Sequence, residues 1–558
     1  MTFSTLAGEV LAGFFLHNPT FATDIGEHAH DDVWPDLSPA GMAAWRAFLA
    51  DAEARLTALP PESLSADDAI DRRLLLENVA AARFRVEELR EEFWNPLSYV
   101  YLFGGGLFSL LSRPFAPLPD RLHSVAARLQ ALPGALEQAR ANLTTAGARP
   151  VSRLHTERAI GRMEGISDLA RSARREAEAL KDAELRAEIH AAAETAVDAV
   201  AQHTAWLRDE LLPAATGDFR LGPELYAAKF RHALLSDVTP EELERRAVAA
   251  YDEVRAEMAR VARSIWSDWM GGADQPEDDD AATRSVLDRI VTDHPAEDEL
   301  LDWCRAENAR IETFVAERDL VGLAEDPLRI VWTPQFLRAF GGAMLIPPGP
   351  LDRGLDSYFA ITPIPEEWSE ERRESWMREQ NTRQLRLLTI HEAVPGHYLQ
   401  LAHANRSASL VRSVFASGVF AEGWAVYVTQ VMMDVGYGAE DPALMLVHWK
   451  FYLRAITNAL MDLRIHAGTM DEAEAMELMT AGGFQEQSEA ANKWDRARLS
   501  STQLCEYFLG CTEHMALEQE ARRRAVAEGH KFVYRPYLES VLAHGTPPMP
   551  LIREILFG

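Results

Sequence analysis

Apolar residues recur at intervals of three and four through most of the 558-residue chain, among Ala, Arg, Glu and Leu. Residues 119–143 (PDRLHSVAARLQALPGALEQARANL) and 182–212 (DAELRAEIHAAAETAVDAVAQHTAWLRDELL) show this spacing most clearly. An α-helix turns once in about 3.6 residues, so residues three and four apart share one face and can be buried together. The pattern therefore predicts a mainly α-helical protein.

One segment departs from this pattern. In residues 328–368 (LRIVWTPQFLRAFGGAMLIPPGPLDRGLDSYFAITPIPEEW), β-branched and aromatic residues are interrupted by Pro and Gly. Such short runs are typical of strands at the edge of a sheet. We therefore expect a small β-sheet here, and an exposed strand edge can bind an extended peptide through main-chain hydrogen bonds.

The length of the chain exceeds that of a typical single domain. We expect a helical N-terminal lobe, residues 1–275, and a catalytic lobe, residues 276–558, with some interweaving of the two. The boundary is placed in residues 271–283 (GGADQPEDDDAAT), whose glycines, proline and acids predict an exposed loop. The acidic residues 278–280 are interpreted as a solvated charge run, with a divalent-cation site as the alternative.

The longest uncharged apolar run lies between Pro96 and Arg113 (LSYVYLFGGGLFSLLS) and has three consecutive glycines in its middle. It is shorter than a membrane span, and we expect a buried turn between helices. A phosphate-binding loop would require Lys and Ser or Thr after the glycines, and these are absent from the sequence.

The composition restricts the possible partners. Asp and Glu total 86 against 56 Lys and Arg, a formal charge of -30, which argues against nucleic acid or an anionic membrane surface. The N-terminus lacks the basic region and cleavage site of a signal peptide. The three cysteines, Cys304, Cys505 and Cys511, have no CxxC spacing, so a reducing cytoplasm is expected.

The most informative motif is RLLTIHEAVPGHYLQ, residues 386–400. His391 and His397 are six residues apart, which separates them by about 240° on a regular helix, whereas the familiar HExxH spacing gives about 40°. Pro395 and Gly396 can interrupt a helix. We therefore predict a break at residues 394–396 that brings both imidazoles to one metal ion, with Glu392 beside them as a general base.

A catalytic zinc usually takes three protein ligands and leaves one position open. Glu422, in VFAEGWAVYVTQ, follows His397 by 25 residues and stands among Val, Phe, Trp and Ala, where a carboxylate needs a partner. Alone it would be interpreted as an ordinary glutamate on an amphipathic helix. Beside the histidine motif, it is the predicted third ligand of a Zn²⁺ ion.

Two further helical pairs are candidates for the chemistry. Asp462 and His466 lie one turn apart in NALMDLRIHAG, which suits a carboxylate-held histidine near a reacting centre or an ordinary core pair. Gln503 and Tyr507 have the same spacing in DRARLSSTQLCEYFLG, and the phenol could donate to an oxyanion or pack in the core.

A second histidine group occurs in GEHAHDD, with His28, His30, Asp31 and Asp32. Alternate spacing could direct both imidazoles to the same side of an extended segment. The segment is surrounded by loop residues and has no base in a recognisable position. Surface capping is the favoured interpretation, with a metal site as the alternative.

The stretches TIHEAVPGHYLQ, EGWAVY, DLRIH, QLCEYFLG and WNPLSYVYLFGG together resemble a large bacterial family of unknown function that has an HExxxGH signature. The resemblance covers nearly the whole chain and implies a gluzincin-type zinc peptidase, similar to thimet oligopeptidase and carboxypeptidase Taq. The implied fold is a large helical, two-sided, clamshell-like one with a deep channel and a small sheet beside the active-site helix. The implied ligands are His391, His397 and Glu422, and the implied base is Glu392.

These observations predict a zinc-dependent hydrolase that acts on short peptides, with Glu392 transferring a proton from water to the leaving amine. An amidase acting on a small non-peptide amide is an alternative substrate class. A metal-stabilised binding protein or inactive homologue is a different class, and the presence of Glu392 counts against it. Cysteine-nucleophile catalysis would need a His/Asn or His/Asp pair near a cysteine, which the sequence does not supply.

Overall fold

The structure, a computed structural model of the chain, describes residues 2–144, 149–333, 338, 343–407 and 409–558. These residues form two compact units. The first comprises Met1–Phe219 with Pro348–Leu355, and the second comprises Arg220–Pro347 with Asp356–Gly558. The boundary expected near residue 275 lies inside the second unit, because residues 240–264, a long helix before it, pack along the helix of residues 442–467 in the same unit.

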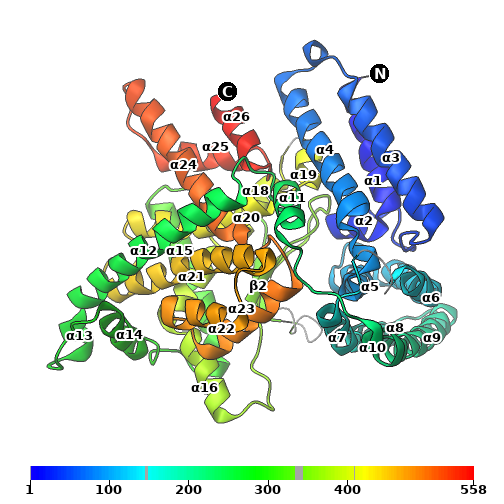
Figure 1. Cartoon of the computed structure of the whole chain (residues 1–558). Helices are drawn as coiled ribbons and strands as arrows, with labels where there is room; N and C mark the ends of the chain where they lie inside the picture. Colours follow the sequence, from blue (N-terminus) through cyan, green and yellow to red (C-terminus); the bar gives the residue numbers. More distant parts are fainter. Residues whose placement is uncertain (1, 145–148, 334–337, 339–342, 408) are drawn as a thin grey trace. The chain divides into compact units, whose positions relative to one another are not determined.

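The first unit is built from helices (Figure 1). They are α1 (Phe3–His17), α2 (Pro19–Ile25), α3 (Pro39–Thr57), α4 (Ala66–Phe84), α5 (Pro96–Ser112), α6 (Leu118–Asn142), α7 (Arg153–Arg162), α8 (Glu164–Ala177), α9 (Ala183–Trp206) and the short α10 (Leu212–Ala214). The two periodic segments of the sequence correspond to α6 and α9, which pack against each other and bury their predicted apolar faces.

Helix α5 corrects one expectation. Residues 104–106 form no turn, because α5 continues through all three glycines and packs against α2, α6, α7 and α8. A Cβ atom at Gly106 would lie 2.5 Å from the ring of Trp34, so the glycine permits a close contact. Tertiary packing therefore outweighs the low intrinsic helix propensity of glycine here.

The second unit contains the remaining helices and all the described strands. The helices are α11 (Pro223–Leu234), α12 (Pro240–Ser264), α13 (Trp266–Met270), α14 (Asp279–Ile290), α15 (Leu300–Glu317), α16 (Glu370–Glu379), α17 (Thr382–Glu392), α18 (His397–Ala404), α19 (Leu410–Val414), α20 (Gly418–Asp434), α21 (Pro442–Ala467), α22 (Glu472–Glu477), α23 (Gln487–Leu499), α24 (Cys505–Ala527), α25 (Tyr534–Leu542) and α26 (Met549–Phe557). The strands are β1 (Leu328–Trp332), β2 (Ala343–Ile346) and β3 (Ser357–Ile361).

Two helix pairs form the centre of the second unit. Helix α12 packs along α21, which is buried over most of its length, and α20 packs along α24 (Figure 1). The second pair meets at two glycines, since a Cβ atom on Gly423 would lie 2.3 Å from the Gly510 backbone. This small-residue contact lets the two backbones approach more closely than larger side chains would allow.

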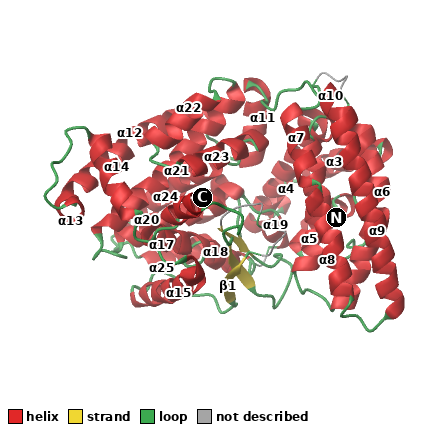
Figure 2. Cartoon of the chain, turned by 90° about the horizontal axis from the view of Figure 1, so that it is seen from below, coloured by secondary structure: helices red, strands yellow, loops and turns green. Residues whose placement is uncertain are grey.

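The expected small sheet is confirmed. Its strand order is β1-β3-β2, with β1 parallel and β2 antiparallel to the central β3. Figure 2 shows the strands in yellow among the helices. Residues Phe359, Ala360 and Ile361 of β3 are buried, whereas β2 is an edge strand. Residues 334–337 and 339–342 of the expected strand region lie outside the described part of the chain.

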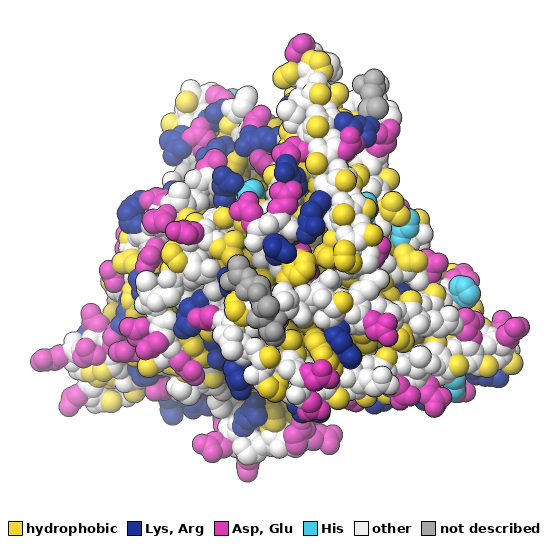
Figure 3. All heavy atoms as spheres, turned by 45° about the vertical axis from the view of Figure 1, so that its right-hand side comes forward, with side chains coloured by type: hydrophobic (Ala, Val, Ile, Leu, Met, Phe, Trp, Pro, Cys, Tyr) yellow, Lys and Arg dark blue, Asp and Glu magenta, His cyan; other side chains and the backbone are white. Residues whose placement is uncertain are grey.

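The prediction of a mainly helical fold is confirmed, and the two-sided arrangement stays a prediction. Acidic side chains are spread over the face seen in Figure 3 and do not gather in one patch. In the expected loop, Asp278 caps α14, while Asp279 and Asp280 pair with Arg263 and Arg255. The acidic run is therefore used in capping and surface ion pairs.

No helix in the described part of the chain combines the length and apolarity that crossing a bilayer requires.

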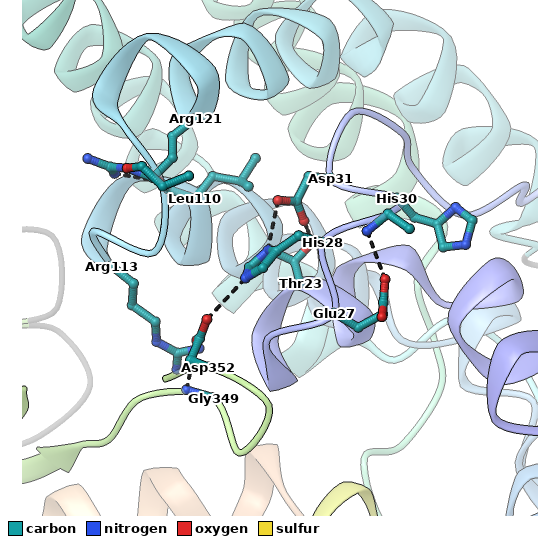
Figure 4. A network of polar contacts seen from close by, with 12 residues as sticks. Thr23, Glu27, His28, His30, Asp31, Leu110, Arg113, Arg121, Gly349 and Asp352 are labelled. Atoms are coloured by element: carbon teal, nitrogen blue, oxygen red, sulfur yellow. Dashed lines mark hydrogen bonds and ion pairs between the residues drawn. The ribbon is translucent and has the colours of Figure 1, made fainter. Parts of the chain in front are cut away.

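The segment 348–355 connects β2 and β3 but belongs to the first unit, where a histidine holds it (Figure 4). The His28 ring bridges two carboxylates, with Nδ1 2.9 Å from Asp31 and Nε2 3.1 Å from Asp352. It also stacks on Phe115 at a centroid distance of 3.7 Å. Asp31 is buried and accepts a hydrogen bond from Thr23. The GEHAHDD segment is thus a partly buried polar network, not surface capping.

This network predicts a pH-dependent contribution to stability. Burial lowers the pKa of His28, but its bonds to Asp31 and Asp352 outweigh burial and raise that pKa to about 9. A raised pKa gives stability that is complete below about pH 6.5 and is lost as the pH rises through about 9. After allowance for solvent screening, we expect about 1 kcal/mol.

Thermal unfolding of wild type and His28→Gln, measured from pH 6 to pH 10, checks this expectation. The difference in melting temperature should be largest near pH 6 and should shrink toward pH 10. A constant difference across this range would contradict the ionic role of His28.

Candidate metal centre

The histidine motif is divided between two helices. Helix α17 ends at Glu392 and α18 begins at His397, and the residues between them have non-helical dihedral angles at Ala393 and Gly396. The peptide bond between Val394 and Pro395 is cis. The predicted break at residues 394–396 is therefore confirmed.

The lack of space at this break requires glycine at position 396. Its φ of -74° is open to other residues, but a Cβ atom there would lie 2.0 Å from the carbonyl oxygen of His391 and 2.3 Å from that of Ile390. Real side chains do not tolerate such distances. The chain can therefore fold back over the end of α17 only with glycine at this position.

The break also receives a hydrogen bond from a third helix. The indole Nε1 of Trp424, on α20, donates to the Pro395 carbonyl at 2.8 Å. This carbonyl lies between the two helices, so the indole supplies a partner for it. Because Trp424 is two residues beyond Glu422, the same bond connects α20 to the histidine motif. The sequence reasoning did not assign a role to this tryptophan.

The break brings the three predicted ligands together. Among the described residues, His391, His397 and Glu422 form a group whose donor atoms all lie within 4.8 Å of one another. The Glu422 Oε2 atom is 3.3 Å from Nε2 of His397 and 3.9 Å from Nε2 of His391. No second group of this kind occurs in the described ranges, and His28 and its neighbours do not form one.

The donor atoms and the shortest of these distances fit a small cation with nitrogen and oxygen ligands. Donor atoms about 2.0–2.2 Å from a tetrahedral zinc ion are separated by about 3.3 Å. Two imidazoles and one carboxylate are also a donor set that catalytic zinc sites use, with a position left for water or substrate. Solvent reaches the group, since the side chains of His397 and Glu422 are 14% and 22% exposed. The residues present therefore fit a catalytic zinc ion.

The electrostatics of the group couple the carboxylate to the imidazoles. Burial would raise the pKa of Glu422, but the bond to His397 and the charges of both imidazoles lower it to about 2. Burial lowers the pKa of His391 to about 3, whereas Glu422 raises that of His397 despite burial. A negative carboxylate thus lies beside two imidazoles, and a cation that binds among them competes with protons for the same donor atoms.

Glu392 lies beside the ligands without being one of them. It is the last residue of α17, is 9% exposed and belongs to no ligand group. Burial raises its pKa to about 7, although His397 and the nearby backbone of Leu345 oppose this effect. Leu345 belongs to β2, so the edge strand of the sheet reaches the same place. A carboxyl group with this pKa can exchange protons near neutral pH.

Two sets of contacts orient α17. On one side, Arg383 pairs with Asp293 and Asp441 at 2.8 and 2.9 Å. On the other, the His391 ring meets Phe451 of α21 edge-on, with centroids 5.6 Å apart. Phe451 was not singled out from the sequence, because an aromatic residue in an apolar helix carries no signal of its own.

Tyr507 lies close enough to the metal centre to be affected by the charge of Glu422. It lies one helical turn before Gly510, which contacts Gly423, the neighbour of Glu422. Its hydroxyl accepts hydrogen bonds from Arg496 at 3.1 Å and Gln503 at 3.3 Å. Burial and the charge of Glu422 raise its pKa to about 12, so the phenol keeps its proton and can donate it in a hydrogen bond.

His466 is not part of this group. Its Nε2 contacts the carbonyl oxygens of Ala497 and Ser500 at 3.0 and 2.7 Å, and its ring stacks on Tyr226. Asp462 accepts hydrogen bonds from Tyr226 and from the Thr502 backbone. The geometry therefore favours the core-pair interpretation, in which both residues hold the end of α21 against the loop before α24.

The cysteines do not form a second centre. Cys304, Cys505 and Cys511 are free and buried, and burial raises the pKa of each thiol. A raised pKa lowers the fraction of reactive thiolate.

The fold and the His, His, Glu group define a mainly helical protein with a candidate metal centre. The chain belongs to the family described as "Bacterial protein of unknown function (DUF885)", whose model matches residues 19–556.

Two solved structures are similar to the chain. One, described as a putative lipoprotein of unknown function from Shewanella oneidensis, is 30% identical, with a TM-score of 0.86 and 100% of both chains covered. The other, described as a putative lipoprotein from Colwellia psychrerythraea, is 16% identical, with a TM-score of 0.81, 99% of this chain and 97% of that one covered. The second likeness shows the fold alone. None of the curated proteins matches the chain.

Removal of one imidazole should remove the metal. We expect purified wild type to hold about one zinc per chain and His397→Ala to lose most of it, because two remaining donors bind zinc poorly. Elemental analysis measures the content. His403→Ala is the control, since His403 lies on the same helix and contacts the Gly322 carbonyl instead. Full zinc content in His397→Ala would contradict the ligand assignment.

The close approach of Gly396 to the end of α17 predicts that a larger residue at this position weakens zinc binding. In Gly396→Ala, the new methyl group must push α18 away from the carbonyls of α17, and we expect zinc affinity to fall about 10- to 100-fold. Competition with a zinc chelator measures this affinity. Gly134→Ala is the matched control, because Gly134 lies within α6 and a Cβ atom there would have no other atom within 4 Å. Unchanged affinity in Gly396→Ala would contradict the role of the break.

Proposed function

We propose that this protein is a zinc-dependent hydrolase of the gluzincin type, with short peptides as its substrates. The observation that carries the proposal is the position of Glu392, next to the convergent His391, His397 and Glu422 but outside the ligand group. A binding protein would need the ligands alone. A hydrolase also needs a carboxylate that can exchange protons at the same place.

The proposed roles follow from the contacts. His391, His397 and Glu422 would hold the zinc ion, which supplies Lewis-acid polarisation of the substrate carbonyl and lowers the pKa of water. Glu392 accepts a proton from the attacking water and passes it to the leaving nitrogen. Its pKa of about 7 suits both transfers.

Tyr507 is proposed to stabilise the oxyanion that develops on the carbonyl oxygen. Its phenol oxygen already accepts from Arg496 and Gln503, so its own hydrogen is directed to a third partner. Both contacts also hold the ring in place before the substrate arrives. His466 takes no part in proton transfer in this scheme, because its contacts are to backbone carbonyls.

The edge strand β2 supports a peptide as substrate. The backbone of Leu345 is close enough to Glu392 to lower its pKa, so main-chain groups of an edge strand lie near the proposed base. An extended peptide can add to such an edge by main-chain hydrogen bonds, which a small non-peptide amide cannot do. Cytoplasmic location stays a prediction from the cysteine content.

The base role predicts a separation of metal binding from activity. Glu392→Gln should keep its zinc and its melting temperature but lose activity about 10²- to 10⁴-fold, because the amide cannot accept a proton. Activity is measured on a mixed peptide library by mass spectrometry, with and without a chelator. Near wild-type turnover in this variant would refute the base role, and absence of chelator-sensitive cleavage by wild type would favour a binding protein.

A further inference from the structure

A group of charged side chains lies beside the metal centre on helices α16, α21 and α23. Four of its members are cations and two are carboxylates. They are Lys450, Arg454, Lys493, Arg496, Glu379 and Glu489. The cations therefore outnumber the carboxylates by two in this charged group.

The two carboxylates are already bonded to two of the cations. Glu489 accepts a hydrogen bond from Arg454 at 2.6 Å, and Glu379 accepts one from Lys450 at 3.4 Å. Glu379 is also 3.8 Å from Arg454. Lys493 forms a longer ion pair with Glu489, at 3.7 Å. Arg496 is therefore the cation of this group that pairs with no carboxylate in the described part of the chain.

Lys493 is buried without a hydrogen-bond partner. It is 8% exposed, its Nζ atom is 3.7 Å from Glu489, and no hydrogen bond to it occurs among the described residues. Glu489 compensates this buried ammonium group only in part, because it forms no hydrogen bond to it, and a second anion that does so would stabilise it. The Lys493 ammonium group is therefore a candidate binding point for a negatively charged ligand.

Arg496 bonds to neutral partners. Its guanidinium donates to Gln503 at 2.7 Å and to Tyr507 at 3.1 Å, and within the described ranges no carboxylate forms an ion pair with it. Solvent reaches this side chain. Because it follows Lys493 by three residues on α23, both cations lie on one helix face. The planar fork of Arg and a neighbouring Lys suit a carboxylate.

Helix contacts place this face next to the reacting atoms. Arg496 bonds to Tyr507, the proposed oxyanion donor. Arg454 lies one turn beyond Phe451, whose ring touches that of His391. The charge of Arg496 lowers the pKa of Glu422, and the charge of Glu422 raises the pKa of Lys493. Both cations are therefore within electrostatic range of a proposed metal ligand.

We propose that Lys493 and Arg496 form a subsite for a carboxylate group of the substrate. The proposal rests on the proposed function and deepens it, since it assigns the substrate class of the same centre. The carboxylate is either the free C-terminus of a peptide or an acidic side chain close to the cleaved bond. A C-terminal carboxylate would make the protein an exopeptidase that acts from the carboxyl end.

The protonation of Lys493 agrees with this assignment. Burial and the charge of Arg454 lower its pKa to about 7, against the effect of Glu489. A bound carboxylate would stabilise the ammonium form and restore the usual charge.

The test measures binding rather than turnover. Zinc-loaded Glu392→Gln is titrated calorimetrically with three peptides: acetyl-Ala-Ala, acetyl-Ala-Ala-amide and acetyl-Glu-Ala-amide. We expect at least one carboxylate peptide to bind about tenfold more tightly than the neutral amide. Tighter binding of acetyl-Ala-Ala identifies a C-terminal carboxylate, and tighter binding of acetyl-Glu-Ala-amide identifies a side chain. Equal binding of all three would overturn the proposal.

Variants in the Glu392→Gln background assign the effect to the two cations. Lys493→Met and Arg496→Gln should each reduce the preference for the carboxylate peptide, and Lys493→Arg should retain it. Arg498→Gln, on the same helix but paired with Asp495, is the control and should retain it too. A preference that survives both Lys493→Met and Arg496→Gln would mean that the carboxylate binds elsewhere, for example on the metal, and would overturn the proposal.

The two proposals fail in different ways. If wild type cleaves no peptide but the carboxylate preference depends on Lys493 and Arg496, the subsite stands and the hydrolase is refuted. If wild type instead cleaves peptides with the same KM whether or not the substrate has a C-terminal carboxylate or an acidic side chain, the subsite is refuted and the hydrolase stands.

Discussion

The metal centre depends on the close contact of Gly396 with the end of α17. Two helices meet there at a distance that excludes even one methyl group, because the carbonyl oxygens of Ile390 and His391 occupy the position of a side chain. This contact turns the chain enough for His397 to face His391 although six residues separate them. The Trp424 indole holds the break from the side of α20. A single steric constraint thus determines whether two imidazoles can share an ion.

A second close contact positions the carboxylate. Gly423 and Gly510 bring α20 and α24 together, which fixes Glu422 on one helix relative to Tyr507 on the other. Glycine is unfavourable inside a helix by about 1 kcal/mol relative to alanine, so each of these positions is stabilised by the packing that it permits. The ligand and the proposed oxyanion donor are consequently held by backbone contacts, which move less than contacts between flexible side chains.

The sequence was sufficient for features that depend on local residue type. The helical faces of α6 and α9, the small sheet and the break at Pro395 and Gly396 all follow from periodicity or from backbone restrictions of neighbouring residues. The helix through residues 104–106 was missed, because its stability comes from contacts with Trp34 and other helices that no local pattern encodes. The unit boundary at residue 219 was missed for the same reason. A signal for the cationic group existed in Lys450 and Arg454, which are spaced one turn apart in an apolar helix, but the ion pair of Arg454 with Glu489 could be found only in three dimensions.

The charge of the whole chain makes the local cations more significant. A protein with a formal charge of -30 repels anionic peptides at long range, and salt screens that repulsion beyond about 10 Å. Beside the metal centre, two cations are incompletely compensated: Arg496 pairs with no carboxylate among the described residues, and Lys493 has Glu489 only at 3.7 Å. Such an arrangement contributes little to folding stability, since a buried ammonium group without a hydrogen bond is unfavourable. It is better explained by binding, in which an anion that bonds to Lys493 and Arg496 recovers the free energy lost when the Lys493 ammonium was buried.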